Sequence, residues 1–460
     1  MLQKKIFIAL ALFFVPIIAN ATNGYFSHGT GVISKSLAGA GVAFPQDAMA
    51  GATNPAGMAF VGNRYDIGAV LFRPDREYSA GSSLANGNGG AFTIGPDSEK
   101  SGDNNFIIPS FGINYMLDER NAIGLSVYGN GGLNTTYSEG SATFDPSGMG
   151  GMGVEFPGVF GDGTAGIDLF QIFFNVSYAH KFSDNFSVGI SPIFAIQGFR
   201  SAGLSNFAPF TKTFAENIFA TGNPTSPDDL KLTRNGQEYS YGGGVQVGAL
   251  ARDVIGTMDL GISYRSKMYM EEFDDYADLF AEEGDFDIPS TLWTGFAVDL
   301  TENMTLVADY QKIWYDDSEA VSNDFQNIFN CPTISGNPNG DFESCLGGEN
   351  GAGFGWDNID IIKVGLQWQA HSDVKMRFGY SHSDNPISSD QVLLNILAPG
   401  VIEDHITMGA TIETQMGEFS LEAMHALHSS VKGPNPFDPT QEIRIKMKQF
   451  EIGASWSKKF

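Results

Sequence analysis

A two-residue alternation runs through the stretch NIDIIKVGLQWQAH, from Asn358 to His371. In an extended chain one face would carry Ile362, Val364, Leu366 and Trp368. The opposite face would carry Lys363, Gly365, Gln367 and Gln369. Because successive side chains of a strand point to opposite sides, this stretch predicts a strand that separates two different environments.

The same alternation recurs along the chain, for example in DVKMRFGYSH (373–382) and HITMGATIE (405–413). We count an even number of such segments, fourteen, after residue 63. They lie near 64–74, 106–116, 121–137, 167–181, 185–200, 238–251, 255–273, 288–300, 303–316, 358–371, 373–384, 402–415, 417–431 and 442–460.

Short and long connections alternate between these segments. The short ones are LDER, SDN, RDVIG, LTEN, HSD and QMG, and the long ones lie near 75–105, 138–166, 201–237, 274–287, 317–357 and 385–401. This rhythm is typical of an outer-membrane barrel with its short turns in the periplasm. A soluble β-sandwich or a solenoid could also alternate, but the chain has no domain break and no fixed repeat period. We predict an all-β protein, a fourteen-stranded antiparallel transmembrane β-barrel, since in lipid only a closed sheet leaves no unpaired edge.

The first 21 residues predict a secretory signal peptide. Lys4 and Lys5 precede an apolar run from Ile6 to Ile18, and Ala19-Asn20-Ala21 is a small-x-small cleavage site. The apolar run is short for a membrane span. We therefore expect a multi-pass barrel in the outer membrane of a Gram-negative bacterium.

The charge and the cysteines limit the possible partners. The formal net charge is −27, and removal of two signal-peptide lysines would make it more negative, which excludes nucleic acid. Cys331 and Cys345 are the two cysteines, and an oxidising compartment predicts a disulfide between them. No histidine is near either cysteine, so we expect no metal site there. We also expect no cofactor. We expect this disulfide loop to lie far from any transport path.

The last predicted strand carries two apolar sets of opposite parity. One set consists of Phe450, Ile452, Ala454, Trp456 and Phe460, and the other of Ile443, Ile445 and Met447. This change predicts either a β-bulge near Lys448 or a strand that has left the membrane at that point.

The segment 22–63 precedes the first strand and is rich in small residues, as in MAGATNPAGMAFVGN (49–63). A fourteen-strand barrel encloses more space than its own inward side chains fill. We expect residues 22–63 to form a plug inside the lumen, with residues 64–460 forming the barrel and its long extracellular loops.

The chain resembles the FadL/TodX-type outer-membrane transporters of long-chain fatty acids and hydrocarbons. The matching elements are SLAGAGVAFPQDAMAGATNPAGMA (36–59), ISYRSKM (262–268) and NILAPGVIEDHITMGAT (395–411). Within the first, Asn54, Pro55 and Ala56 match the hatch motif of the family. The resemblance implies a fourteen-strand barrel with an N-terminal hatch, passive uptake of hydrophobic molecules, and contact with outer-membrane lipid and lipopolysaccharide. We expect a monomer.

Three glycines, Gly129, Gly131 and Gly132, interrupt a well-patterned strand. Glycine inside a strand marks a bulge or a sharp bend, which could be a simple turn at the rim. The resemblance implies instead a strand kinked inward, with a lateral opening in the wall through which an apolar substrate leaves.

Two predicted extracellular loops are unusually apolar. In SNFAPFTKTFAENIFATG (205–222), four side chains are spaced as one helical stripe. The candidate external groove consists of Met149, Met152, Phe156, Phe160, Phe207, Phe210, Phe214 and Ile218. These residues could equally pack only on neighbouring loops.

Four basic residues are candidates to hold a substrate carboxylate: Arg265, Lys267, Lys363 and Arg377. Each could instead be a lumen charge paired with an acid. Gln197 occupies about the place of a basic residue found in relatives that bind fatty acid, which favours hydrocarbons. A general porin is a further alternative. No recognisable motif surrounds His180 or His405, and a spacing of three puts His425 and His428 on opposite strand faces, so we expect neither an enzyme nor a metal site.

Overall fold

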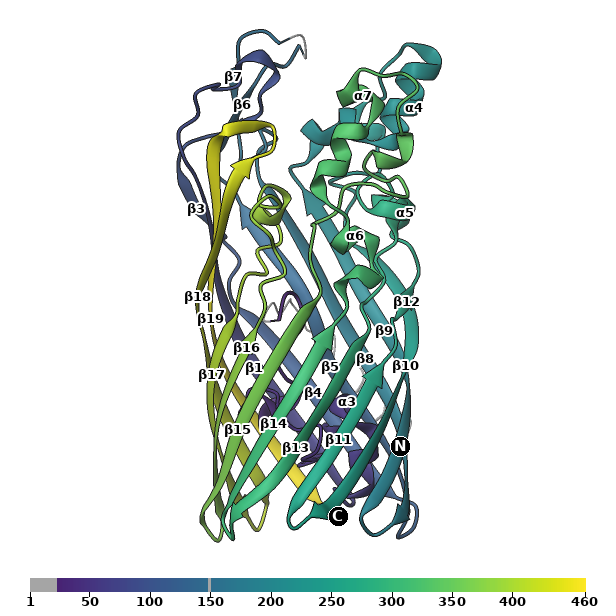
Figure 1. Cartoon of the computed structure of the whole chain (residues 1–460), viewed down its shortest axis with the longest axis vertical. Coiled ribbons are helices and arrows are strands. Elements are labelled where there is room, and N and C mark those ends of the chain that lie inside the picture. Colours follow the sequence, from purple (N-terminus) through teal and green to yellow (C-terminus); the bar gives the residue numbers. More distant parts are fainter. Residues whose placement is uncertain (1–22, 148–149) are drawn as a thin grey trace, which may run out of the picture.

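The computed structural model describes residues 23–147 and 150–460. The predicted signal peptide and Met149 lie outside the described residues. The chain forms a closed antiparallel β-barrel of fourteen strands, as predicted, with short turns at one end and long loops at the other (Figure 1). The barrel strands are β1 (Arg64–Ala80), β4 (Phe106–Met116), β5 (Asn121–Tyr137), β8 (Ala165–Ser183), β9 (Phe186–Ala202), β10 (Glu238–Ile255), β11 (Met258–Arg265), β13 (Thr291–Thr301), β14 (Met304–Ile313), β15 (Ile359–His371), β16 (Val374–Ser383), β17 (Asp404–Thr414), β18 (Gly417–Asn435) and β19 (Asp438–Lys459).

One predicted strand is shorter than expected. The segment predicted as 255–273 ends at Arg265, and a separate two-residue strand, β12 (Tyr269–Met270), follows it. The interruption coincides with Lys267, whose ammonium forms a 2.7 Å ion pair with Asp287 of the following loop. The remaining strands are β3 (Ser98–Lys100), which pairs with β1, and a small sheet of β2 (Thr93–Ile94), β6 (Ser141–Phe144) and β7 (Val154–Pro157).

Short helices occur in the plug and in the long loops. The plug contains α2 (Gly31–Lys35), α3 (Ala50–Thr53) and the 3-10 helix η1 (Pro55–Ala59). The loops contain η2 (Asn88–Gly90), η3 (Ser205–Phe210), α4 (Lys212–Thr221), η4 (Pro227–Asp229), η5 (Asp274–Tyr276), α5 (Ala281–Gly284), η6 (Tyr315–Asp317), α6 (Glu319–Ser322), η7 (Phe325–Asn330), α7 (Pro332–Ser335), η8 (Phe342–Ser344) and η9 (Leu394–Ile396). Among the described residues, no helix is both long enough and apolar enough to cross a bilayer.

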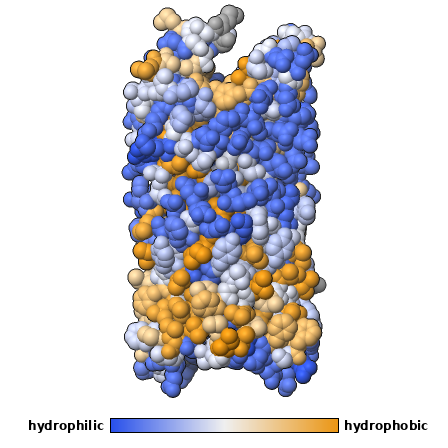
Figure 2. All heavy atoms as spheres, in the orientation of Figure 1, coloured by the Kyte–Doolittle hydropathy of each residue, from blue (hydrophilic) through white to orange (hydrophobic). Residues whose placement is uncertain are grey.

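The strand β19 keeps one alternation along its whole length, and its apolar side chains change sides. Near the short-turn end the outward Phe450 and Ile452 are exposed and the inward Glu451 is buried. Toward the loop end Ile443 and Ile445 point inward and are buried, while the outer positions are charged. On the face shown in Figure 2, a band of apolar surface covers the lower part of the barrel and the surface above it is mainly hydrophilic, so the upper part extends beyond the hydrocarbon core.

The expected bulge is not on β19. The register shifts on β18, where Leu427 and His428 together oppose Lys448. β19 itself therefore needs no irregularity, because a change of solvent outside the wall, from lipid to water, reverses the apolar face without changing the parity. Of the two predictions for this segment, the second therefore describes β19: the strand leaves the membrane near Lys448.

Residues 23–63 lie within the barrel, where their backbone is held by inward side chains of many strands (Figure 1). Their small residues allow this close packing. A plug inside the lumen was predicted.

Candidate functional site

The plug is fixed to the wall by polar contacts between residues far apart in the chain. Lys35 forms a buried ion pair with Glu451 of β19, with 2.8 Å between Nζ and each carboxylate oxygen. Asp309 of β14 accepts hydrogen bonds from the backbone N–H groups of Gly41 and Val42, at 2.7 and 2.9 Å. These charged and polar partners replace the water that a bare lumen would offer the plug backbone.

The segment Asn54-Pro55-Ala56 caps the helix η1 and contacts the wall. Asn54 Oδ1 accepts the Ala56 N–H at 3.1 Å, and Asn54 Nδ2 donates to the carbonyl oxygens of Val42 and Ala249 at 2.8 and 3.1 Å. A side chain at Gly248 would occupy the place of the Asn54 amide, so this wall glycine permits the close approach. Asn54 thus joins two parts of the plug to β10.

The strand β5 bulges at the predicted glycines. The extra residue is Asn130, since the pairing with β8 shifts between Gly129 and Gly131. The pairing of β5 with β4 ends at Tyr128. Beyond this point, the six residues from Asn130 to Thr135 are all buried.

The plug takes over the edge of β5 that β4 leaves. Ser27 donates its N–H to the carbonyl of Asn130, and Gly132 donates its N–H to the carbonyl of Tyr25, both at 2.9 Å. Phe26 and Gly131 form an antiparallel bridge between these two bonds. An added Cβ at Gly131 would collide with the Tyr25 carbonyl, so glycine is required for this contact. Residues 25–27 therefore act as a short replacement strand, which we call the gate segment.

A chain of polar side chains connects the bulge to three further strands. Arg265 Nη1 donates to Asn130 Oδ1 at 2.7 Å, and Asn130 Nδ2 donates to Gln171 at 2.9 Å. Gln171 donates to Gln197 at 3.3 Å, and Gln197 donates to the Phe286 carbonyl at 2.9 Å. Arg265 carries the single formal charge of this chain. Its guanidinium lies 4.9 to 5.5 Å from the ring centres of Phe26, Phe173 and Trp293.

The four candidate carboxylate partners do not lie together. Arg265 and Lys363 line one cavity of about 30 Å³ between the gate segment and the wall. Lys363 also donates to the His28 carbonyl at 2.7 Å. Lys267 is paired with Asp287 in a loop, and Arg377 donates to Gln367, Thr411 and Gln46 elsewhere in the lumen. Neither Lys267 nor Arg377 lines this cavity, which has room for water molecules but not for an acyl chain.

Several phenylalanines of the predicted external groove pack against other aromatic rings of the loops, and their role in capture stays a prediction. Phe160 and Phe207 are buried and lie 5.4 Å apart, and Phe156 stacks on Phe144 at 4.7 Å. Phe437, at the tip of the β18–β19 hairpin, lies within 6.4 Å of four rings, those of Phe92, Phe210, Phe325 and Phe329. Met152 stays apart from the cluster and is 83 % exposed. We call these ring-contacting phenylalanines the loop cluster.

The single helical stripe expected over residues 207–218 is wrong. Phe207 and Phe210 belong to η3, and Phe214 and Ile218 belong to α4. Between them Thr211 is extended and its side chain caps α4 by accepting the Phe214 N–H. The cap ends one helix and starts another.

Cys331 and Cys345 are joined by a disulfide. The bridged loop contacts the backbone next to the loop cluster, and its distance from a transport path stays a prediction. Leu346 N–H donates to the Phe210 carbonyl and Lys212 N–H to the Leu346 carbonyl, both at 2.9 Å. The disulfide therefore supports the backbone of the aromatic loop.

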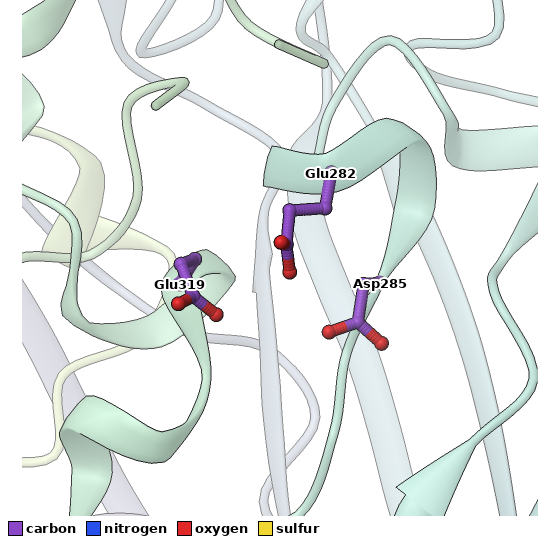
Figure 3. A group of neighbouring side chains, drawn as sticks. All are labelled: Glu282, Asp285 and Glu319. Carbon is purple, nitrogen blue, oxygen red and sulfur yellow. The ribbon is translucent and has the colours of Figure 1, made fainter. Parts of the chain in front are cut away.

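Three loop carboxylates, those of Glu282, Asp285 and Glu319, have oxygens within 4.8 Å of one another (Figure 3). Burial and the neighbouring Asp287 raise the pKa of Asp285 to about 7. Partial protonation near neutral pH thus reduces the repulsion within this group, and we assign it no function.

Several site residues escaped the sequence analysis. The gate segment has no local sequence signal, because its partners on β5 lie more than a hundred residues away. Gln171 has none either, because its partner Asn130 lies on another strand, β5. Asn130 was visible as the polar residue between the glycines. Phe437 was detectable as an aromatic residue at a Pro-rich turn.

Comparisons with known proteins place this architecture in a family. The family model described as outer membrane protein transport protein (OMPP1/FadL/TodX) matches residues 21–415. A search of curated protein sequences found no match. Among solved structures, the toluene transporter TodX of P. putida is similar at a TM-score of 0.62 and 15% identity, covering 94% of this chain and 99% of that one.

Two further structures show the same fold. A FadL homologue of Pseudomonas aeruginosa has a TM-score of 0.59 and 16% identity, and the toluene transporter TbuX of Ralstonia pickettii has 0.58 and 15%. Each comparison covers 94% of this chain and 99% of the other. Because the family model spans most of the sequence, this chain belongs to the OMPP1/FadL/TodX family of outer-membrane transport proteins.

Proposed function

We propose that this protein takes up hydrophobic molecules, long-chain fatty acids in the first instance, and releases them sideways into the outer membrane. One observation carries the proposal: apolar side chains line the inside of the upper barrel and the outside of the lower barrel. A molecule that stays among apolar side chains must therefore cross the wall between these two zones. The bulge of β5, where pairing with β4 is lost, supports a crossing at this height.

Entry begins at the loop cluster. Burial of each methylene group contributes about 0.8 kcal/mol, so capture of a long acyl chain needs no energy source. The barrier is the polar lipopolysaccharide layer, through which the loops extend. From the loop cluster the substrate moves inward toward Arg265, where the cavity is too small for an acyl chain until the gate segment moves.

The next step is displacement of the gate segment. It is held to β5 by two backbone hydrogen bonds, and typical net contributions are about 1 kcal/mol each. Hydrophobic contacts of Tyr25 with Tyr315 and Trp356 add to the closed state. A bound chain that replaces these aromatic contacts offsets their loss, and the freed edge of β5 opens the wall.

Arg265 is the first candidate to hold a carboxylate, and Lys363 is the second. No acidic side chain of the described residues forms an ion pair with Arg265, so its charge is available to a ligand. Charge-assisted hydrogen bonds to a carboxylate are stronger than those it now makes to amide and hydroxyl oxygens. The uncharged Gln171–Gln197 chain favours the second candidate function, hydrocarbon uptake by the same route. Two toluene transporters and a monoaromatic hydrocarbon channel have this fold, which supports the same candidate.

The test is to identify what the protein binds. Lipids extracted from the purified protein should contain long-chain acids, and Arg265→Met should lose them while retaining the loop cluster. Hydrocarbons alone would support the second candidate. In planar bilayers we expect almost no steady ion conductance, whereas large, steady conductance would indicate a porin and overturn the proposal. We expect no catalytic turnover of the ligand.

A further inference from the structure

One buried arginine of the wall is left without a countercharge. Arg76 points inward from β1 and is 3 % exposed. Its Nη1 donates to the carbonyl of Asn134, and its Nε and Nη2 have no hydrogen-bond partner. No carboxylate of the described residues lies within the 4.0 Å of an ion pair. A buried guanidinium with two free donor atoms is costly, which indicates a role for it.

Arg76 lines a cavity on the far side of the bulge from Arg265. This cavity, of about 10 Å³, is bounded by Phe72 of β1, Gly132 and Leu133 of β5, and Met447 of β19. The nearest acid on β8, Asp168, is already engaged by Arg200 at 3.1 Å and by Asn134 at 3.2 Å. Arg76, with two buried donor atoms that lack a partner, therefore lines a space beside Gly132, whose N–H group bonds to the gate segment.

The height of Arg76 in the wall is defined by its neighbours. On the outer face of β1, Leu71 is 49 % exposed, and two residues further on Arg73 is charged and exposed. On β19 the same change occurs between Phe450, which is opposite Arg73, and Lys448, which is opposite Asp75. Arg76 is opposite Met447, just beyond this boundary. A group bound to Arg76 sits at the polar edge, and a chain attached to it extends into the hydrocarbon layer.

We propose that Arg76 binds the carboxylate of an amphipathic substrate as it leaves through the wall. The inference rests on the proposed uptake function and extends it, because it makes an acid headgroup part of the exit step. Guanidinium and carboxylate match in a two-bond geometry, and the two free nitrogens of Arg76 supply both donors. Arg265 and Arg76 then hold the headgroup in turn, before and after the gate segment moves.

The experiment compares a long-chain fatty acid with the fatty alcohol of the same chain length. Uptake by cells is measured for the wild type, Arg76→Gln, Arg76→Lys and the control Arg73→Gln, whose side chain lies three residues away on the outer face. We expect Arg76→Gln to slow acid uptake by about tenfold and alcohol uptake by less than about twofold, because a charge-assisted pair is lost for the acid alone. Arg76→Lys should recover part of the acid uptake, and Arg73→Gln should change neither.

The alcohol also reports whether the variant barrel folds and opens. Equal loss of acid and alcohol uptake in Arg76→Gln would assign Arg76 a structural role and overturn the inference. Loss of a phospholipid or lipopolysaccharide from the purified variant, with acid uptake unchanged, would also overturn it, because the anion would then be a membrane phosphate. Uptake of neither compound by the wild type would overturn the proposed function together with this inference.

Discussion

The lower and upper halves of the barrel use the same strands in opposite ways. In the lower half, inward side chains such as Glu451 and Asp309 are polar and hold the plug, and the outer face is apolar. In the upper half, inward side chains such as Ile443 join the packed loops, and the outer face is charged. The plug is thus held by specific polar contacts and the loops by apolar packing. The bulge of β5 lies where one arrangement gives way to the other.

The largest expected effect is on the lower half. Replacement of Lys35 by Met leaves Glu451 buried without its cation, beside the buried Glu422. Breaking a buried pair in this way costs about 3 to 5 kcal/mol. We expect the plug to leave its place and the barrel to conduct ions, as recorded in planar bilayers. Lys432→Met, which breaks an exposed ion pair with Glu442, is the control, and equal conductance in both variants would contradict this account.

A side chain at Gly131 should disturb the boundary itself. Gly131→Ala places a methyl group against the Tyr25 carbonyl, so the gate segment must move away from β5. We expect resistance of the purified protein to proteolysis near residue 25 to fall, with the barrel intact.

The control for this variant is Gly102→Ala, near the same edge, where the added Cβ lies 3.8 Å from the Thr136 carbonyl in ordinary contact. Unchanged protection in Gly131→Ala would show that residues 25–27 do not depend on β5.

A substitution in the upper half should weaken capture of the substrate and leave the plug in place. Phe437→Ser removes the ring that joins four others, at up to about 3 kcal/mol of burial. Uptake at limiting substrate should fall severalfold, and uptake at saturating substrate should change little. Phe219→Ser, which removes a half-exposed ring of α4, is the control. Equal uptake by both variants at limiting substrate would show that the loop cluster does not take part in capture.

The smallest expected effect is a pH dependence of the plug. Burial, followed by the charges of Lys35, His405 and Lys363, holds the pKa of His28 well below its ordinary value. His28 is therefore neutral in the closed state and binds a proton below about pH 6.5 once released. The closed state keeps this contribution above that pH and loses it as the pH falls, by up to about 1.4 kcal/mol for each unit.

A spin label at Ser27→Cys measures this effect. The mobile fraction of the label should rise between pH 7.5 and pH 5.5, and His28→Gln should abolish the rise. An equal rise in both proteins would assign the pH dependence to another group.

The sequence predicts the barrel well because apolar and polar side chains alternate along a strand whose two faces lie in different environments. The fourteen strands, the plug and the bulge at Gly129–Gly132 follow from such local patterns. The parity of the apolar residues of β19 left two predictions open, a bulge or a strand that leaves the membrane, since local alternation does not record where the membrane ends. The contacts of the plug were beyond prediction for a different reason. Lys35 and Glu451 are separated by 416 residues, and the sequence around each of them does not indicate the other as its partner.

The central claim is that the gate segment must leave β5 before a substrate can pass. Ser27 and Asn130 are neighbours across the short pairing, at a spacing of about 5.5 Å that a disulfide can bridge. In a background with Cys331 and Cys345 replaced by Ser, the pair Ser27→Cys and Asn130→Cys should lock the gate segment when oxidised. We predict that uptake of the fatty acid is lost in the oxidised protein and restored by a reductant. Equal uptake before and after reduction, in protein shown to be cross-linked, would contradict the account.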